Sequence, residues 1–233
     1  MFAGINVLWE PKQAFDAFKE RPKWLAPLLV VVLVGIATTA FHFLRMDISA
    51  ELLESMAANL PEGQEDGLDK MEGMIGVIAA VTTTLAVLGP IIRLLVIGFL
   101  AWLISKIFAG EGGFTDGLGV AAMASMPLMV AGLLSVPIAL GYAEPPGLEE
   151  LQSMLKTHPG AWLGLDTKHP AFVAFAQFDV FQLWALVLLI LGTARVMAVP
   201  AMKAAMVFVG IKIALASMGV MGAMAGQLAQ QVG

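Results

Sequence analysis

The sequence predicts an all-α fold, a polytopic transmembrane helical bundle with five spans, and three observations support this prediction. Of the 233 residues, 59% are hydrophobic and only 13% are charged, whereas a soluble domain carries about 25% charged residues. The mean hydropathy of +0.85 is too high for a surface in contact with water. The apolar residues also gather in segments of about 20 residues or more, the length that crosses a bilayer. Most of the chain therefore requires lipid as its solvent.

Five apolar segments follow an N-terminal segment, residues 1–24, which we expect to be cytoplasmic and amphipathic. Residues 25–233 then form one membrane domain. The second apolar segment would be about 54 Å long as a single helix, with Gly89 and Pro90 near its middle. We expect one long helix that is kinked there, and two short spans hinged at these residues are the alternative. Pro127 is expected to kink the third span. The five predicted spans are residues 25–44, 73–108, 118–140, 172–199 and 202–226.

Two short amphipathic helices are predicted outside the spans. Ala14, Phe15 and Phe18 share one face of a helix that lies just ahead of the first span. This apolar face can enter the membrane interface, or it can pack on the protein's own cytoplasmic loops. A second interfacial helix is expected within residues 45–72, where apolar residues again recur at helical spacing.

The distribution of Lys and Arg predicts the orientation in the membrane. Short loops on the cytoplasmic side of bacterial and other membranes carry an excess of these residues. With five spans, the first segment and two short loops share one side, and the long loops share the other. We therefore expect an inner (plasma) membrane protein with a cytoplasmic N-terminus and an outer C-terminus. The basic residues on the expected inner side are Lys12, Lys19, Arg21, Lys23, Lys106, Arg195 and Lys203.

Three ionisable residues fall within or near the predicted spans: Arg93, Lys212 and Asp179. A charge inside the membrane costs several kcal/mol unless it is paired or hydrated, so such residues are the first candidates for function. They predict a polar pocket, such as a path for an ion or a lipid headgroup. The alternatives are a structural ion pair of Asp179 with Arg93 or Lys212, a side chain that extends to the membrane interface, and a shallow Asp179 at the start of its helix.

Small residues recur every four positions on several spans, which lets helices approach closely in lipid. Gly117, Ala121 and Ser125 form one such face, and Gly222 and Gly226 form another. These faces can serve the internal bundle or association with another chain, either a membrane-protein partner or a second copy. A further small-residue face on the second span comprises Gly76, Ala80 and Thr84.

Several classes of function have no support in the sequence. The chain has no cysteine, which excludes disulfides and thiol catalysis. It has no nucleophile motif or phosphate-binding loop, so we expect no enzyme, no catalytic residue and no cofactor. His42, His158 and His169 lack the spacing of helical metal ligands, so no metal site is expected. A net charge of −5 without a basic patch argues against nucleic acid as a partner.

Three stretches resemble the Yip domain family (Ypt/Rab-interacting proteins), which includes bacterial members. They are PKQAFDAFKERPKW before the first span, AWLISKIFAGEGGFTDGLGVAAMASMPLMV with Ala-Ser-x-Pro at Ala124 to Pro127, and FAQFDVFQLWALVLLILGTARV with Asp179, Phe181 and Trp184. The resemblance implies five spans and a cytoplasmic N-terminus, and, for eukaryotic members, membrane trafficking with Rab GTPases. The eukaryotic signature Asp-Leu-Tyr-Gly-Pro is absent here.

The expected function is therefore that of a non-enzymatic scaffold, accessory subunit or membrane-organising protein that binds partner helices and membrane lipids. The alternative is a small transporter or a lipid- or ion-handling protein that uses the intramembrane charges.

Overall fold

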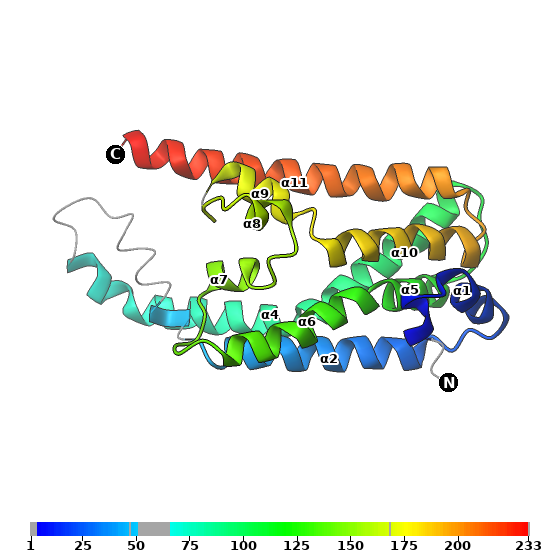
Figure 1. The fold of residues 1–233 in the computed structure, drawn as a ribbon, viewed down its shortest axis with the longest axis horizontal. Helices are drawn as coiled ribbons and strands as arrows, with labels where there is room; N and C mark the ends of the chain where they lie inside the picture. The colour runs from blue at the N-terminus through cyan, green and yellow to red at the C-terminus, as the bar shows by residue number, and fades with distance from the viewer. Residues whose placement is uncertain (1–3, 47, 51–65, 168, 233) are drawn as a thin grey trace.

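The computed structural model describes residues 4–46, 48–50, 66–167 and 169–232, and the regular structure in them is helical (Figure 1). Most of the interfacial helix predicted within residues 45–72 lies outside these described residues. The long helices run roughly along the long axis of the molecule. They are α2 (Leu25–Phe43), α4 (Asp66–Ile107), α5 (Phe114–Ala124), α6 (Met126–Leu140), α10 (Val180–Val196) and α11 (Ala201–Val232).

Four stretches of the described chain are helical, long and apolar enough to cross a membrane. They are Leu25–Phe43, Met74–Ile107, Phe114–Leu140 and Ala201–Ala225. The short helix α9 (Pro170–Ala176) and α10 make a fifth if their 45° bend lies within one span. The prediction of an all-α polytopic bundle is confirmed, and the fourth predicted span is a bent pair of helices.

Helix α4 is continuous through Gly89 and Pro90, so the segment is one long helix and not two hinged ones. Its 42 residues extend about 63 Å. The proline ring packs against α2, where a Cβ at Gly35 would lie only 2.9 Å from Pro90 Cβ. A small residue on α2 thus makes room for the proline of α4.

The third predicted span consists of two helices joined end to end, α5 and α6. Ser125 lies between them, and its hydroxyl donates a hydrogen bond of 2.8 Å to the Ala121 carbonyl oxygen. Pro127 falls in the first turn of α6, where a missing backbone N–H costs nothing. The predicted kink at Pro127 is therefore a junction between helices and not a bend inside one.

The N-terminal helix α1 (Pro11–Glu20) follows the short 3-10 helix η1 (Ile5–Leu8) and packs on α10. Phe15 is completely buried and Phe18 is 4% exposed. The ring of Phe18 lies against Gly119 of α5. Protein, not lipid, therefore covers the apolar face of this helix.

Three short helices fill the long connection between α6 and α10: α7 (Leu148–Ser153), α8 (Pro159–Trp162) and α9. Figure 1 shows them between α11 and the layer of α2, α4 and α6, at the end of the molecule away from α1. Helix α9 packs on both α8 and α11. Helix α9 therefore covers part of α11 at this end.

Candidate functional site

A cavity of about 750 Å³ lies among α4, α5, α6, α10 and α11, and we call it the lateral cavity. Its volume is within the range of small-molecule sites. Its walls are mainly apolar, and its rim includes residues of α4 and α11 that are about half exposed, Val96 at 51% and Leu215 at 56%. The cavity is therefore open to the surroundings of the protein between these two helices.

The lateral cavity is closed at the end where α4 leads into α5 and α10 leads into α11. There the Glu111 backbone N–H donates a hydrogen bond of 2.8 Å to the Met197 carbonyl oxygen. A Cβ at Gly110 would lie 2.9 Å from the side chain of Val199, so the two loops are in close contact. From this closed end, α4 and α11 diverge toward the short helices (Figure 1).

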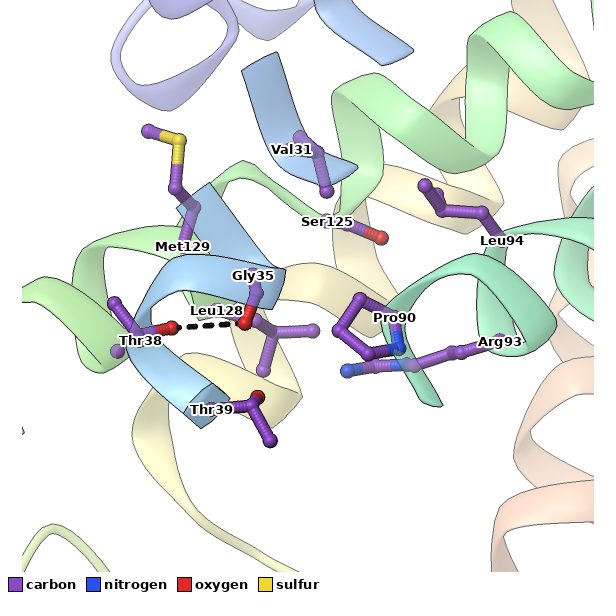
Figure 2. A pocket seen from close by; sticks show the side chains of 11 residues that line it. Val31, Gly35, Thr38, Thr39, Pro90, Arg93, Leu94, Ser125, Leu128 and Met129 are labelled. Carbon is purple, nitrogen blue, oxygen red and sulfur yellow. Dashed lines mark hydrogen bonds between the residues drawn. The ribbon is translucent and has the colours of Figure 1, made fainter. Parts of the chain in front are cut away.

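Arg93 of α4 lines the lateral cavity and also a smaller cavity of about 270 Å³. Figure 2 shows its side chain extending past Pro90 toward Thr39 of α2. Among the residues that the structure describes, no hydrogen bond or ion pair involves the Arg93 guanidinium. A span of α4 thus holds an unpartnered cation.

Lys212 of α11 lines the lateral cavity from the opposite side. Its ammonium group donates a hydrogen bond of 3.2 Å to Gln177 Oε1 and another to Gln182 Oε1. Both acceptors are neutral amides, and Gln182 also lines the cavity. The charge of Lys212 is therefore hydrogen-bonded but not neutralised by these partners.

Asp179 is the N-cap of α10 and lies at the bend between α9 and α10. One carboxylate oxygen accepts hydrogen bonds from the backbone N–H groups of Phe181 at 2.8 Å and Gln182 at 3.2 Å. The other accepts a hydrogen bond from the Thr157 hydroxyl. The described residues contain no ion pair of Asp179 with Arg93 or Lys212. Of the expectations for Asp179, the geometry matches a residue that starts its helix.

The structure thus brings two of the three intramembrane ionisable residues to one cavity, and both are cations. Arg93 lies 14 residues before the end of α4 and Lys212 lies 11 residues after the start of α11, which places them about 21 and 17 Å from the closed end. No Asp or Glu is among the described residues that line the lateral cavity. The cavity is mainly apolar, and we call the region around Arg93 and Lys212, near its middle, the positive level.

The small-residue faces have two different environments. A Cβ at Gly117 would collide with the carbonyl oxygen of Gly98, so this face joins α5 to α4, and Ala121 and Ser125 on it are buried. In contrast, nothing lies within 4 Å of a Cβ at Gly222. Gly226 belongs to the same helix. The first face serves the internal bundle, and Gly222 faces outward.

The three histidines serve local structure. His42 shares a hydrogen bond of 2.8 Å with the Ser135 hydroxyl, and His158 and His169 accept backbone N–H groups at the starts of α8 and α9. Burial lowers the pKa of His158, and the Asp179 carboxylate partly opposes this shift. Within the described part of the chain, no three His, Cys, Asp or Glu residues converge as metal ligands do.

Sequence reasoning missed the glutamines at Lys212 and the contacts that hold α1. Gln182 is a polar amide within an apolar segment, and its position could have indicated a polar contact inside the bundle. The ion pair of Arg195 with Asp16, at 2.6 Å, joins positions far apart in the chain. Spacing along the sequence contains no sign of such a pair.

The comparison with curated proteins gave no match, and the comparison with solved structures gave none either. A family model described as Yip1 domain matches residues 5–224, which is almost the whole chain and includes α1, the long helices and the lateral cavity. The resemblance seen in the order of the sequence motifs is thereby confirmed. The chain belongs to the Yip1 domain family of membrane proteins.

Proposed function

We propose that the protein is a non-enzymatic membrane-organising protein that binds a membrane lipid in the lateral cavity. The observation that carries this proposal is the cavity itself, with apolar walls and an opening between α4 and α11. Ile92, Val96 and Leu215 on its rim are 46%, 51% and 56% exposed. In a bilayer these side chains face acyl chains, so the acyl chain of a lipid can enter the cavity from the side.

The proposed orientation places the closed end of the cavity at the cytoplasmic side of the inner membrane. This assignment rests on the positive-inside rule, since Lys106 and Lys203 flank the closed end. Lys106 donates a hydrogen bond of 3.1 Å to the Gly112 carbonyl oxygen, and Lys203 lies 5.0 Å from the centre of the Phe108 ring. The N-terminal helix α1 is then cytoplasmic, and the end of α11 is on the outer side.

A pair of matched substitutions on α4 tests the proposed lipid site. Val96 lines the lateral cavity and Val81 does not, yet both side chains are 51% exposed. Val96→Trp places a large ring in the opening, whereas Val81→Trp places the same ring on the lipid-facing surface. Native mass spectrometry of the detergent-purified protein should find bound phospholipid in the wild type and in Val81→Trp, and less in Val96→Trp. Equal lipid retention in all three proteins would exclude the cavity as the site.

A second proposed role is association with another membrane helix through the outward small-residue face of α11. The observation that favours it is the open space around Gly222, which lies four residues before Gly226, because helices in lipid associate where small residues at this spacing allow close approach. Gly210 on the same helix is equally free of neighbours within 4 Å and serves as the control. Cross-linking in membranes should find that Gly222→Leu weakens a self-association or partner contact and that Gly210→Leu does not. Loss of the contact in neither variant would rule out this face.

A further inference from the structure

We propose that the lateral cavity selects an anionic phospholipid, whose phosphate lies between Arg93 and Lys212. This inference rests on the lipid site proposed above and adds the chemistry of its headgroup. It requires that the two cations share one space, that neither is already neutralised, and that the space beside them suits an acyl chain.

Arg93 and Lys212 meet the first requirement because both line the same cavity from opposite helices, α4 and α11. The Arg93 side chain extends toward Thr39 of α2 (Figure 2), so its guanidinium turns toward α11 when it binds the phosphate. Their distances from the closed end differ by only about 4 Å along the helices, so they form one positive level. Gln182, whose side-chain NH2 group can donate hydrogen bonds to an anion, lines the cavity as well.

The second requirement is met because, among the described residues, no carboxylate forms an ion pair with either cation. Within the part of the chain that the structure describes, the Arg93 guanidinium has no partner, and Lys212 is bonded to two neutral amide oxygens. The Asp179 carboxylate is near enough to interact with Lys212 electrostatically, but it is held as the cap of α10 and forms no ion pair with either cation within the described residues. An unneutralised cation in a span is costly, and a phosphate that binds two of them removes that cost while forming charge-assisted hydrogen bonds.

The shape and polarity of the cavity meet the third requirement. Between the positive level and the closed end, its walls are Ile97 and Leu100 of α4, Leu189 of α10 and Phe208 of α11. An acyl chain can extend along these side chains while its phosphate stays at Arg93 and Lys212. A free phosphate ion would leave the apolar part of the cavity empty, and a zwitterionic headgroup would bring its own cation to a positive level. An anionic phospholipid provides both an acyl chain for the apolar walls and a phosphate for the two cations.

The test uses the full chain in nanodiscs that contain equal amounts of phosphatidylglycerol and phosphatidylcholine with identical acyl chains. Native mass spectrometry then measures the ratio of the two lipids that remain bound. We expect the wild type to favour phosphatidylglycerol by at least about tenfold, and Arg93→Met with Lys212→Met to lose this preference. Arg45→Met is the matched control, because Arg45 lies outside the cavity and contacts Phe41 and the Ala139 carbonyl oxygen. Its lipid ratio should equal that of the wild type.

Each negative result would overturn a specific part of the two proposals. Equal binding of the two lipids by the wild type would overturn the anionic preference and leave the proposed lipid site intact. Retention of neither lipid would overturn both proposals. If millimolar inorganic phosphate removed the preference, a free anion and not a phospholipid would be the ligand. Arg93→Lys keeps the charge, so a preference retained by Arg93→Lys supports the proposal even if the methionine variants fail to fold.

Discussion

The ring of Phe15 lies against Gly192, so closely that a Cβ at position 192 would fall 2.7 Å from two of its ring carbons. This contact joins the N-terminal helix α1 to the middle of the C-terminal half of α10. It exists because Gly192 has no side chain and leaves a hollow that the ring fills. Phe15 is completely buried there.

We predict that Gly192→Leu expels the Phe15 ring and destabilises the protein by about 1–3 kcal/mol, the usual cost of overpacking a core. The measurement is thermal unfolding in detergent, with the accessibility of α1 to a protease as a second readout. Asp16→Ala is the control on the same helix. Because the Asp16 and Arg195 side chains are 52% and 38% exposed, their ion pair should contribute less than about 1 kcal/mol. A larger effect of Asp16→Ala than of Gly192→Leu would show that charge, and not packing, holds α1.

The contact of Gly117 with α4 predicts a second destabilising substitution. A Cβ at position 117 would collide with the Gly98 carbonyl oxygen and lie 3.3 Å from the Trp102 backbone nitrogen. Backbone atoms cannot move aside as a flexible side chain can, so Gly117→Leu must separate α5 from α4. We expect a markedly lower unfolding temperature for Gly117→Leu than for Gly210→Leu, whose new side chain enters open space. Equal unfolding temperatures would contradict the close packing described for α5.

The cap at Asp179 predicts different results for its alanine and asparagine variants. Asp179→Ala removes the acceptor of two backbone N–H groups and should cost about 0.5–2 kcal/mol, as the loss of an N-cap does. Asn is an equally good N-cap residue, so Asp179→Asn should keep most of this stability. The measurement is thermal unfolding together with hydrogen exchange of the Phe181 and Gln182 amides. If Asp179→Asn is as unstable as Asp179→Ala, the charge and not the cap is what matters.

The buried ring of His158 predicts that the short helices loosen in acid. Burial lowers the pKa of His158 in the folded protein, so the unfolded chain binds the proton more readily. The stability from the neutral ring is present above the ordinary histidine pKa of about 6.5 and is lost as the pH falls through the lower pKa of the folded state. Protonation also removes the Nδ1 acceptor of the Ala161 N–H.

Hydrogen exchange of the Ala161 amide, corrected for the intrinsic effect of pH, measures this loosening. Protection should decrease between about pH 7 and pH 5 in the wild type. In His158→Asn, which keeps an N-cap acceptor but does not titrate, protection should be independent of pH. The same pH dependence in both proteins would assign the loosening to another group.

The all-α membrane fold was predictable because the long segments are too apolar to be exposed to water and must therefore lie in lipid. The continuity of α4 followed in the same way, since two spans hinged at Pro90 would each have been at the lower limit of length. The bend between α9 and α10 was not predicted, although Asp179 is a strong helix-start residue and could have indicated it.

The importance of Arg93 and Lys212 was predictable from the cost of charge in a span, but their common cavity was not. They are more than a hundred residues apart, and only the packing of α10 between α5 and α11 brings them to one space. The position of α1 was likewise not predictable from the sequence. Its apolar face indicated that something must cover it, but the complementary glycines lie on α5 and α10, far along the chain.

Helix α10 carries Gln182 near one end and Gly192 near the other, within a single stretch of 17 residues. The first contacts the ammonium group of Lys212, and the second receives the ring of Phe15. A helix is stiff along its axis, so it acts as a rod between these two contacts. One continuous helix thus connects the packing of the N-terminal helix to the polar contact of Lys212.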